Sequence, residues 1–199
     1  MNRKLIIYGA SGHGKVVADI AKRNGYQDIV FFDDDKEKRR LGIYDVVHSF
    51  DGLEDYDLFV AIGSNKTREM ISKRTDKEQI SLIHPNAVIS EDVQIGKGVV
   101  VMAGAVINAG AVIEDGVIIN TCASIDHDNV IGEFSHISVG AHTAGTVSIG
   151  KRVFVGAGST IINNICVCDD VLIGAGAVVV KDILEPGTYI GVPAIERIK

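Results

Sequence analysis

Residues 95–118 read IGKGVV VMAGAV INAGAV IEDGVI, four consecutive hexads that each begin with Ile or Val and carry Ala or Val at the fifth position. The six-residue period runs from Ile83 to Leu184, and every hexad begins with Ile or Val except the one at Thr143. An α-helix cannot hold this repeat on one face, because six residues at 100° each leave successive members 120° apart. Short strands joined by corners can, so the period predicts a parallel β-helix.

Three hexads form an 18-residue coil with three sides, and glycines at the second and fourth hexad positions suit its tight corners. Each coil should stack on the next at about 4.8 Å through strand ladders, with the first and fifth positions facing inward. The sixth position should face outward, yet one column 18 residues apart contains Ile118, His136, Phe154 and Leu172. Outward apolar surface of this kind is typical of an interface. We therefore expect a homotrimer, and a returning C-terminal segment is the alternative cover.

Residues 3–82 follow a different pattern, in which buried strand runs alternate with helical periodicity. The expected strands are 4–8, 29–32, 58–62 and 80–83, and the expected helices are 15–24 and a segment ending near Arg74. This order predicts a small parallel α/β unit. The predicted organisation is an α/β domain over residues 1–82, an all-β parallel β-helix over 83–184 and a C-terminal segment over 185–199.

Polar and glycine residues follow the strands of the first domain at their carboxyl ends. They are Ser11, Gly12, His13, Asp33, Asp34 and Gly63. Ligands of parallel α/β sheets bind beyond these strand ends, and a glycine loop before a helix favours a phosphate. Eighty residues are too few for a full dinucleotide domain, so one nucleotide is the better fit. The alternative is that the glycine loop merely connects strand to helix.

His127 lies in the run Ser-Ile-Asp-His-Asp-Asn at residues 124–129, between two carboxylates on a predicted corner. An adjacent acid can fix the tautomer of an outward imidazole and raise its basicity, which suits a general base. Asn129 occupies a fifth, inward position and must find hydrogen-bond partners there. It is expected to brace the corner. The alternative interpretation is an outward histidine without a function.

Several classes of function are disfavoured by composition. The net charge of −6 argues against nucleic acid as a partner. No apolar run approaches the roughly 20 residues of a membrane span, and the four-residue apolar run near the start is too short for a secretory signal. Three cysteines indicate a reducing, cytoplasmic protein.

A metal site is also not expected. His136 and His142 occupy the same hexad position one hexad apart, so they point about 120° apart and could chelate with His127 only between chains. Cys166 and Cys168 lack the second pair of a zinc site.

Five motifs spread over the chain resemble those of a known family. They are Tyr-Gly-Ala-Ser-Gly-His-Gly at 8–14, Phe-Asp-Asp at 32–34, Ala-Ile-Gly at 61–63, Ile-Gly-Glu-Phe-Ser-His at 131–136 and Ile-Gly-Val-Pro-Ala at 190–194. Together with the hexads, the chain resembles the left-handed β-helix acyltransferases. More narrowly, it resembles the bacterial nucleotide-sugar N-acetyltransferases that act on UDP-4-amino-4,6-dideoxy sugars, such as the enzymes that form UDP-N-acetylbacillosamine.

The resemblance implies a left-handed β-helix, acetyl-CoA as cosubstrate and no metal. It implies that His127 is the general base and that Asp128 orients it. It implies that the nucleotide-sugar lies against Ser11, Gly12, His13, Asp33, Asp34 and Gly63. It implies further that acetyl-CoA lies along the groove between coils near His136, Ala157 and Ala175. One departure is Asp128 itself, since the bacillosamine-type enzymes carry Glu after the histidine.

The expected activity is therefore acetylation of the 4-amino group of a UDP-linked 4-amino-4,6-dideoxy sugar. Three alternatives stay open at this point. They are a GDP-amino-sugar enzyme of the perosamine type, an O-acetyltransferase acting on a sugar hydroxyl, and a non-catalytic trimer that binds a nucleotide-sugar.

Overall fold

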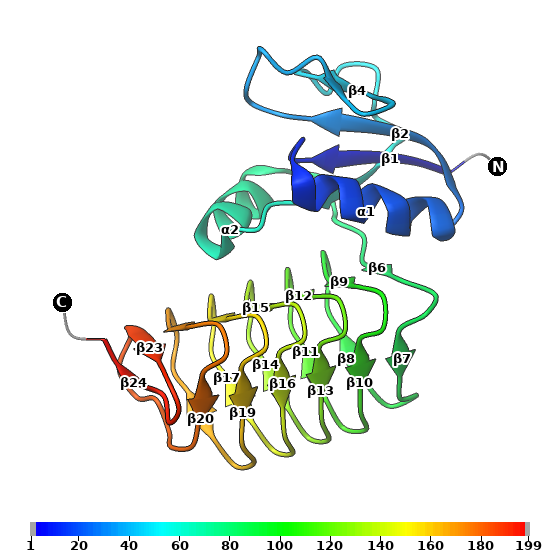
Figure 1. Ribbon diagram of the computed structural model, residues 1–199. Coiled ribbons are helices and arrows are strands. Elements are labelled where there is room, and N and C mark those ends of the chain that lie inside the picture. Colours follow the sequence, from blue (N-terminus) through cyan, green and yellow to red (C-terminus); the bar gives the residue numbers. More distant parts are fainter. Residues whose placement is uncertain (1–2, 198–199) are drawn as a thin grey trace.

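A computed structural model describes residues 3–197 and shows a small α/β domain lying against the side of a long three-sided β-helix (Figure 1). The small domain contains β1 (Arg3–Tyr8), α1 (Gly12–Arg23), β2 (Tyr26–Phe32), β3 (Arg40–Leu41), β4 (Tyr44–Val47), β5 (Asp57–Val60) and α2 (Asn65–Arg74). Its sheet has the order β3-β4-β2-β1-β5, in which only β3 is antiparallel to its neighbour. Alternate side chains of β1 pack on the α1 side and the α2 side, so both faces are buried.

The β-helix is built from two-residue strands, each made of the sixth position of one hexad and the first position of the next. The first wall contains β6 (Leu82–Ile83), β9 (Val100–Val101), β12 (Ile118–Ile119), β15 (His136–Ile137), β18 (Phe154–Val155) and β21 (Leu172–Ile173), and ends in β23 (Thr188–Ile190) and β24 (Ile195–Glu196). The second wall contains β7 (Val88–Ile89), β10 (Val106–Ile107), β13 (Ser124–Ile125), β16 (His142–Thr143), β19 (Thr160–Ile161) and β22 (Val178–Val179). The third wall contains β8 (Gln94–Ile95), β11 (Val112–Ile113), β14 (Val130–Ile131), β17 (Ser148–Ile149) and β20 (Cys166–Val167).

The interior of the β-helix follows the hexad prediction. Strands pair in parallel with residues 18 positions apart, such as Ile107 with Ile125. First- and fifth-position side chains form one continuous aliphatic core, in which even Thr143 and Asn129 are buried. Each coil is too narrow to bury much alone, so stacking along the prism stabilises it.

The corners explain why glycine recurs at the fourth hexad position. That residue has a positive φ both where it is glycine, as in Gly110 with φ of 74°, and where it is not, as in Asp128 with φ of 56°. The left-handed conformation is favourable for glycine and tolerable for Asp and Asn. The left-handed corner therefore recurs at the fourth position from Gly98 to Gly176, including at corners that lack glycine, whereas second-position glycines such as Gly132 do not have a positive φ.

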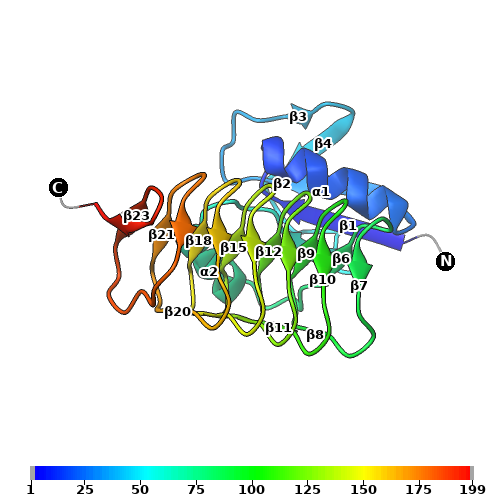
Figure 2. The ribbon, with the colours of Figure 1, turned by 60° about the horizontal axis from the view of Figure 1, so that its bottom comes forward.

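The small domain covers the first wall from β6 to β15, where Leu82, Val100, Ile118 and His136 are buried, and Figure 2 shows it lying along the β-helix rather than capping an end. Val100, Met102 and Ile118 belong to the same apolar cluster as Val17 and Ile20 of α1. This corrects one expectation: within the outward column, Ile118 and His136 are buried by the chain's own first domain, whereas Leu172 remains 44% exposed. The interface interpretation overlooked intramolecular docking as a way to cover apolar surface.

Smaller differences concern element bounds. Strand β6 pairs with β9 of the β-helix instead of joining the first sheet, and α1 begins at Gly12 inside the glycine loop. The strands β3 and β4 were not predicted, because two and four residues are too short to show a period. Residues 1–2 of the expected first domain and 198–199 of the expected C-terminal segment lie outside the described residues. None of the helices within residues 3–197 has the length and apolar character needed to cross a membrane.

Candidate active site

His127 and Asp128 form a hydrogen-bonded pair on the corner between the second and third walls. The Nδ1 atom of His127 lies 2.8 Å from Oδ2 of Asp128, and both side chains are more than half exposed. The carboxylate accepts the Nδ1–H, so Nε2 carries the lone pair and faces solvent. This hydrogen bond is the main reason that the pKa of His127 is raised above its ordinary value, and the charges of Asp126 and Asp128 act in the same direction. An accessible base at the tip of a rigid corner results.

The neighbouring coils make room for this pair. A Cβ atom on Gly145 would stand 2.4 Å from Nε2 of His127, and one on Gly110 would stand 2.5 Å from Oδ1 of Asp128. Any side chain at either glycine would displace the pair. The positive φ at Asp128 turns its carboxylate back toward the imidazole of the preceding residue. The corner conformation therefore places both groups.

Asn129 braces the same corner from inside the β-helix, as the sequence predicted. Its Nδ2 donates to the carbonyl oxygens of Asp126, His127 and Ala144 at 2.8 to 3.1 Å. One amide thus ties two successive coils together below the imidazole. Asp126 adds a further restraint, because it accepts the backbone N–H of His127 and the side chain of Asn108.

The residues of the predicted crevice follow the carboxyl ends of the parallel strands β1, β2 and β5. Oδ2 of Asp33 accepts the backbone N–H of Ala10 at 2.9 Å and the Nζ of Lys38 at 2.8 Å. Burial alone would raise the pKa of Asp33, but these hydrogen bonds and that from the backbone of Asp35 hold the pKa below its ordinary value. Asp33 is therefore a carboxylate that fixes the glycine loop at its back. Ser11, Gly12 and Gly63 are exposed at the loop tips.

Asp34 belongs to a second polar group at the same strand ends. Its Oδ2 accepts the hydroxyl of Tyr8 at 2.7 Å and lies 3.3 Å from the guanidinium of Arg74, which also contacts the Tyr8 oxygen. The carboxylate stays largely exposed. It can therefore accept hydrogen bonds from a ligand in the crevice.

His13 and His136 lie where the first domain meets the first wall, with ring centroids 6.4 Å apart. Burial, assisted by the positive charge of Arg68, lowers the pKa of His13 to about 4 and that of His136 to about 3. Both imidazoles are therefore neutral at physiological pH. Nε2 of His136 accepts from the amide of Asn120 at 3.0 Å, and its Nδ1 is buried without a partner among the described residues.

Within one chain, the predicted site residues form one group at the first domain and the adjoining first wall, and a second group on the opposite corner of the prism. Ser11, Gly12, His13, Asp33, Asp34, Gly63 and His136 belong to the first domain or to the wall beneath it. Ala157 and Ala175 are exposed on the adjoining corner between the first and second walls. His127 and Asp128 lie on the opposite corner of the prism, away from the first wall. One chain therefore does not bring its own His127 to its own crevice.

Two neighbouring features were missed by the sequence analysis. Asn120, the partner of His136, shares its coil but lies 16 residues away, and no motif points to it. An open groove of about 470 Å³ runs from Gly63 and Lys66 to Phe154 and Leu172 on the first wall. Within residues 3–197, no group of three or more His, Cys, Asp or Glu side chains could hold a metal ion.

Two family models match the chain. The PglD N-terminal domain model matches residues 4–75, and the bacterial transferase hexapeptide model of six repeats matches residues 78–109. A GDP-perosamine N-acetyltransferase of Escherichia coli is 26% identical over 168 residues, which cover 78% of this chain and 76% of that protein.

Several solved structures match this chain almost from end to end. The acetyltransferase domain of PglB from Neisseria gonorrhoeae, in complex with acetyl coenzyme A, is 40% identical with a TM-score of 0.93 and covers 99% of this chain and 100% of that chain. PerB from Caulobacter crescentus, in complex with CoA and GDP-perosamine, is 36% identical with a TM-score of 0.91 and covers 98% and 97%. With this similarity, the chain belongs to the left-handed β-helix nucleotide-sugar N-acetyltransferases, which take the acetyl group from acetyl-CoA.

Proposed function

We propose that the protein acetylates the 4-amino group of a UDP-linked 4-amino-4,6-dideoxy sugar and that His127 is the general base. The observation that supports this most strongly is the 2.8 Å pair of His127 and Asp128, which leaves Nε2 free on an exposed corner. An imidazole whose pKa is raised by a hydrogen bond to a carboxylate suits proton removal in water.

The chemistry of amide formation requires such a base. The sugar amine attacks the thioester carbonyl as the neutral amine, and the tetrahedral intermediate carries a positive nitrogen and a negative oxygen. Nε2 of His127 accepts the nitrogen's proton, the carbon–sulfur bond breaks, and the thiolate of CoA leaves and takes up a proton. General-base assistance of this kind contributes about 10²–10⁴ in rate, and corner N–H groups are suited to the oxyanion.

In this proposal the active form is a homotrimer with its active sites between subunits. The nucleotide-sugar lies against Ser11, Gly12, His13, Asp33, Asp34 and Gly63 of one subunit. Acetyl-CoA lies near His136, Ala157 and Ala175 of the same subunit, while His127 and Asp128 come from the next. The supporting observation is the placement of His127 on the corner opposite the first wall.

A GDP-linked 4-amino sugar of the perosamine type is the second candidate substrate. It is favoured by two relatives, one named a GDP-perosamine N-acetyltransferase and one solved with GDP-perosamine bound. The presence of Asp128 in place of the Glu of bacillosamine-type enzymes supports the same alternative.

The test is a panel of UDP- and GDP-linked 4-amino sugars with acetyl-CoA, read by release of free thiol and by mass spectrometry of the product. We expect one UDP-linked 4-amino sugar to give the highest kcat/KM and a product that resists mild base, as an amide does and an ester does not. If a GDP-linked sugar gave the highest kcat/KM, the second candidate would replace the UDP-linked sugar as the proposed substrate. A base-labile product, or no thiol release with any amine, would overturn N-acetylation.

A further inference from the structure

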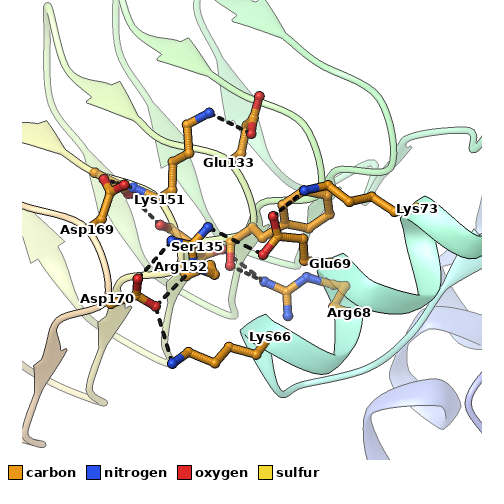
Figure 3. A network of polar contacts seen from close by, with 12 residues as sticks. Lys66, Arg68, Glu69, Lys73, Glu133, Ser135, Lys151, Arg152, Asp169 and Asp170 are labelled. Atoms are coloured by element: carbon orange, nitrogen blue, oxygen red, sulfur yellow. Dashed lines mark hydrogen bonds and ion pairs between the residues drawn. The ribbon is translucent and has the colours of Figure 1, made fainter.

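Arg68 of α2 is the largest of the side chains that the fold buries completely, with 1% of its surface exposed. Burial lowers the pKa of its guanidinium to about 9, so it remains charged at neutral pH. Within residues 3–197, no carboxylate lies at ion-pair distance from it. Nearby Arg152 differs, since its guanidinium pairs with Asp170 and Glu69 (Figure 3). A charge buried without a counter-ion is costly unless hydrogen bonds satisfy it.

Backbone carbonyl oxygens satisfy this charge, and they come from both sides of the junction between the two domains. Nε donates to Gly116 at 2.7 Å, and Nη2 donates to Phe134 at 2.6 Å and more weakly to Ser135 at 3.3 Å. Nη1 donates to Ile62 at 2.8 Å and more weakly to Gly63 at 3.3 Å. The rigid planar fork of an arginine can join these carbonyls in one fixed arrangement, which a lysine ammonium cannot.

Asn65, one helical turn earlier, extends the same attachment. Its Oδ1 accepts from Nη2 of Arg68 at 3.0 Å, and its Nδ2 donates to the carbonyl of Val153 at 3.1 Å. Gly116, Phe134 and Val153 lie at corners of three successive coils. Hydrogen bonds from Arg68 and Asn65 therefore attach α2 to three successive coils of the β-helix.

The hydrogen bonds of Arg68 reach both halves of the candidate site, which are the nucleotide-sugar crevice and the acetyl-CoA groove. Gly63 belongs to the nucleotide-sugar crevice, and Ser135 directly precedes His136. The rings of His136 and His13, one from each domain, have centroids 6.4 Å apart. A shift of the domain would change the distance between the Gly63 loop and His136.

We propose that Arg68 is a positioning residue for acetyl transfer, whose guanidinium fixes the crevice of the first domain at one distance and angle from the acetyl-CoA groove of the β-helix. This inference rests on the proposed function. Each substrate can bind its own half of the site without Arg68. The reaction needs both halves in register, because an error of about 1 Å in alignment costs about 10²-fold in rate.

The experiment compares Arg68→Lys, which keeps the charge and loses the fork, with the wild-type protein and with Lys73→Met as a matched control. Lys73 lies on the same helix, is exposed and pairs with Glu69 (Figure 3). Calorimetry gives the dissociation constants of CoA and of the nucleotide-sugar, and single-turnover mixing gives the rate of acetyl transfer.

For Arg68→Lys we expect a transfer rate about 100-fold below wild type, with both dissociation constants within about threefold of wild type. Lys73→Met should match wild type in every measurement. Retention of the wild-type rate, or a rate loss explained by weaker binding alone, would overturn the proposal. An inactive wild-type protein would instead refute the proposed function.

A second variant covers the case in which Arg68→Lys fails to fold. Asn65→Ala keeps the guanidinium and its backbone contacts but removes the bridge to Val153. It should lower the transfer rate about tenfold with binding unchanged, and a wild-type rate in this folded variant would contradict the role assigned to the attachment.

Discussion

His127 owes its orientation to its neighbours in the corner. The carboxylate of Asp128 holds Nδ1, the amide of Asn129 holds the backbone beneath, and Gly145 leaves space for Nε2. The sequence predicted the histidine, its acidic partner and the inward asparagine, because each departs from the hexad pattern. It could not identify Gly110 and Gly145 as the neighbours that make room, since this depends on which residues stack across coils.

The pair also makes a prediction about pH. The base must be neutral to act, so kcat/KM falls as the pH drops through the pKa of His127, which the Asp128 hydrogen bond raises. In Asp128→Asn this hydrogen bond to the charged form is lost, so the acidic limb of the profile should move to lower pH. The amide N–H of the asparagine donates to Nδ1 and so stabilises the tautomer that has its proton on Nε2. That tautomer has no lone pair on Nε2, so the plateau of kcat/KM should fall by about 10²–10⁴-fold.

Profiles of thiol release between pH 5 and 9 would check this, with one substrate so that its amine titrates equally in both proteins. Asp126→Asn is the control, because Asp126 acts on the imidazole through its charge alone and not through a hydrogen bond to the ring. The acidic limb of the Asp126→Asn profile should move less than that of Asp128→Asn, and its plateau of kcat/KM should stay high. An unchanged limb and plateau in Asp128→Asn would contradict the assigned role of the acid.

At the level of elements, the hexads define a two-residue strand with one inward and one outward side chain. The period predicted this alternation correctly because the strands from β6 to β22 pair with residues 18 positions apart, whereas Thr188 of β23 pairs only 16 residues after Leu172. The strands β3 and β4 were not predicted because segments of two and four residues are too short to show a period. Regularity, rather than propensity, is what made the β-helix predictable.

Strand β17 offers a direct test of this alternation. Ile149 is 1% exposed, whereas its neighbour Ser148 faces out. Ile149→Ala should lower the free energy of unfolding by about 2–5 kcal/mol, as truncations in tightly packed cores do. Ser148→Ala should change it by no more than about 0.5 kcal/mol. Urea denaturation of both variants measures the two values, and equal losses would show that the predicted register of the coil is wrong.

At the scale of the whole molecule, the sequence predicted two domains but not how they dock. The apolar outward column was predicted to be buried by a partner. For Ile118 and His136 the partner is the chain's own first domain and not another subunit. Beside the apolar contacts of α1 and the ion pair of Arg152 with Glu69, the docking depends on hydrogen bonds from Arg68 and Asn65 to backbone carbonyls. Every residue has a carbonyl, so such partners leave no trace in a sequence.

The docking leaves His127 on the far corner from the predicted crevice of its own chain. Our central proposal is that His127 of one subunit acts on a sugar held by the next. Subunit complementation tests it most directly. One partner is His127→Ala, which lacks the base. The other is Gly12→Leu, which keeps its base and puts a large side chain into the crevice, where a Cβ meets open space.

Each variant alone should be nearly inactive, and co-expressed subunits should be assayed for thiol release with the preferred nucleotide-sugar. A site regains function when its crevice comes from the first variant and its base from the second, so random equal mixing should restore about one quarter of the wild-type rate. A mixture that stays as inactive as its two components would place base and crevice in one subunit and contradict the account.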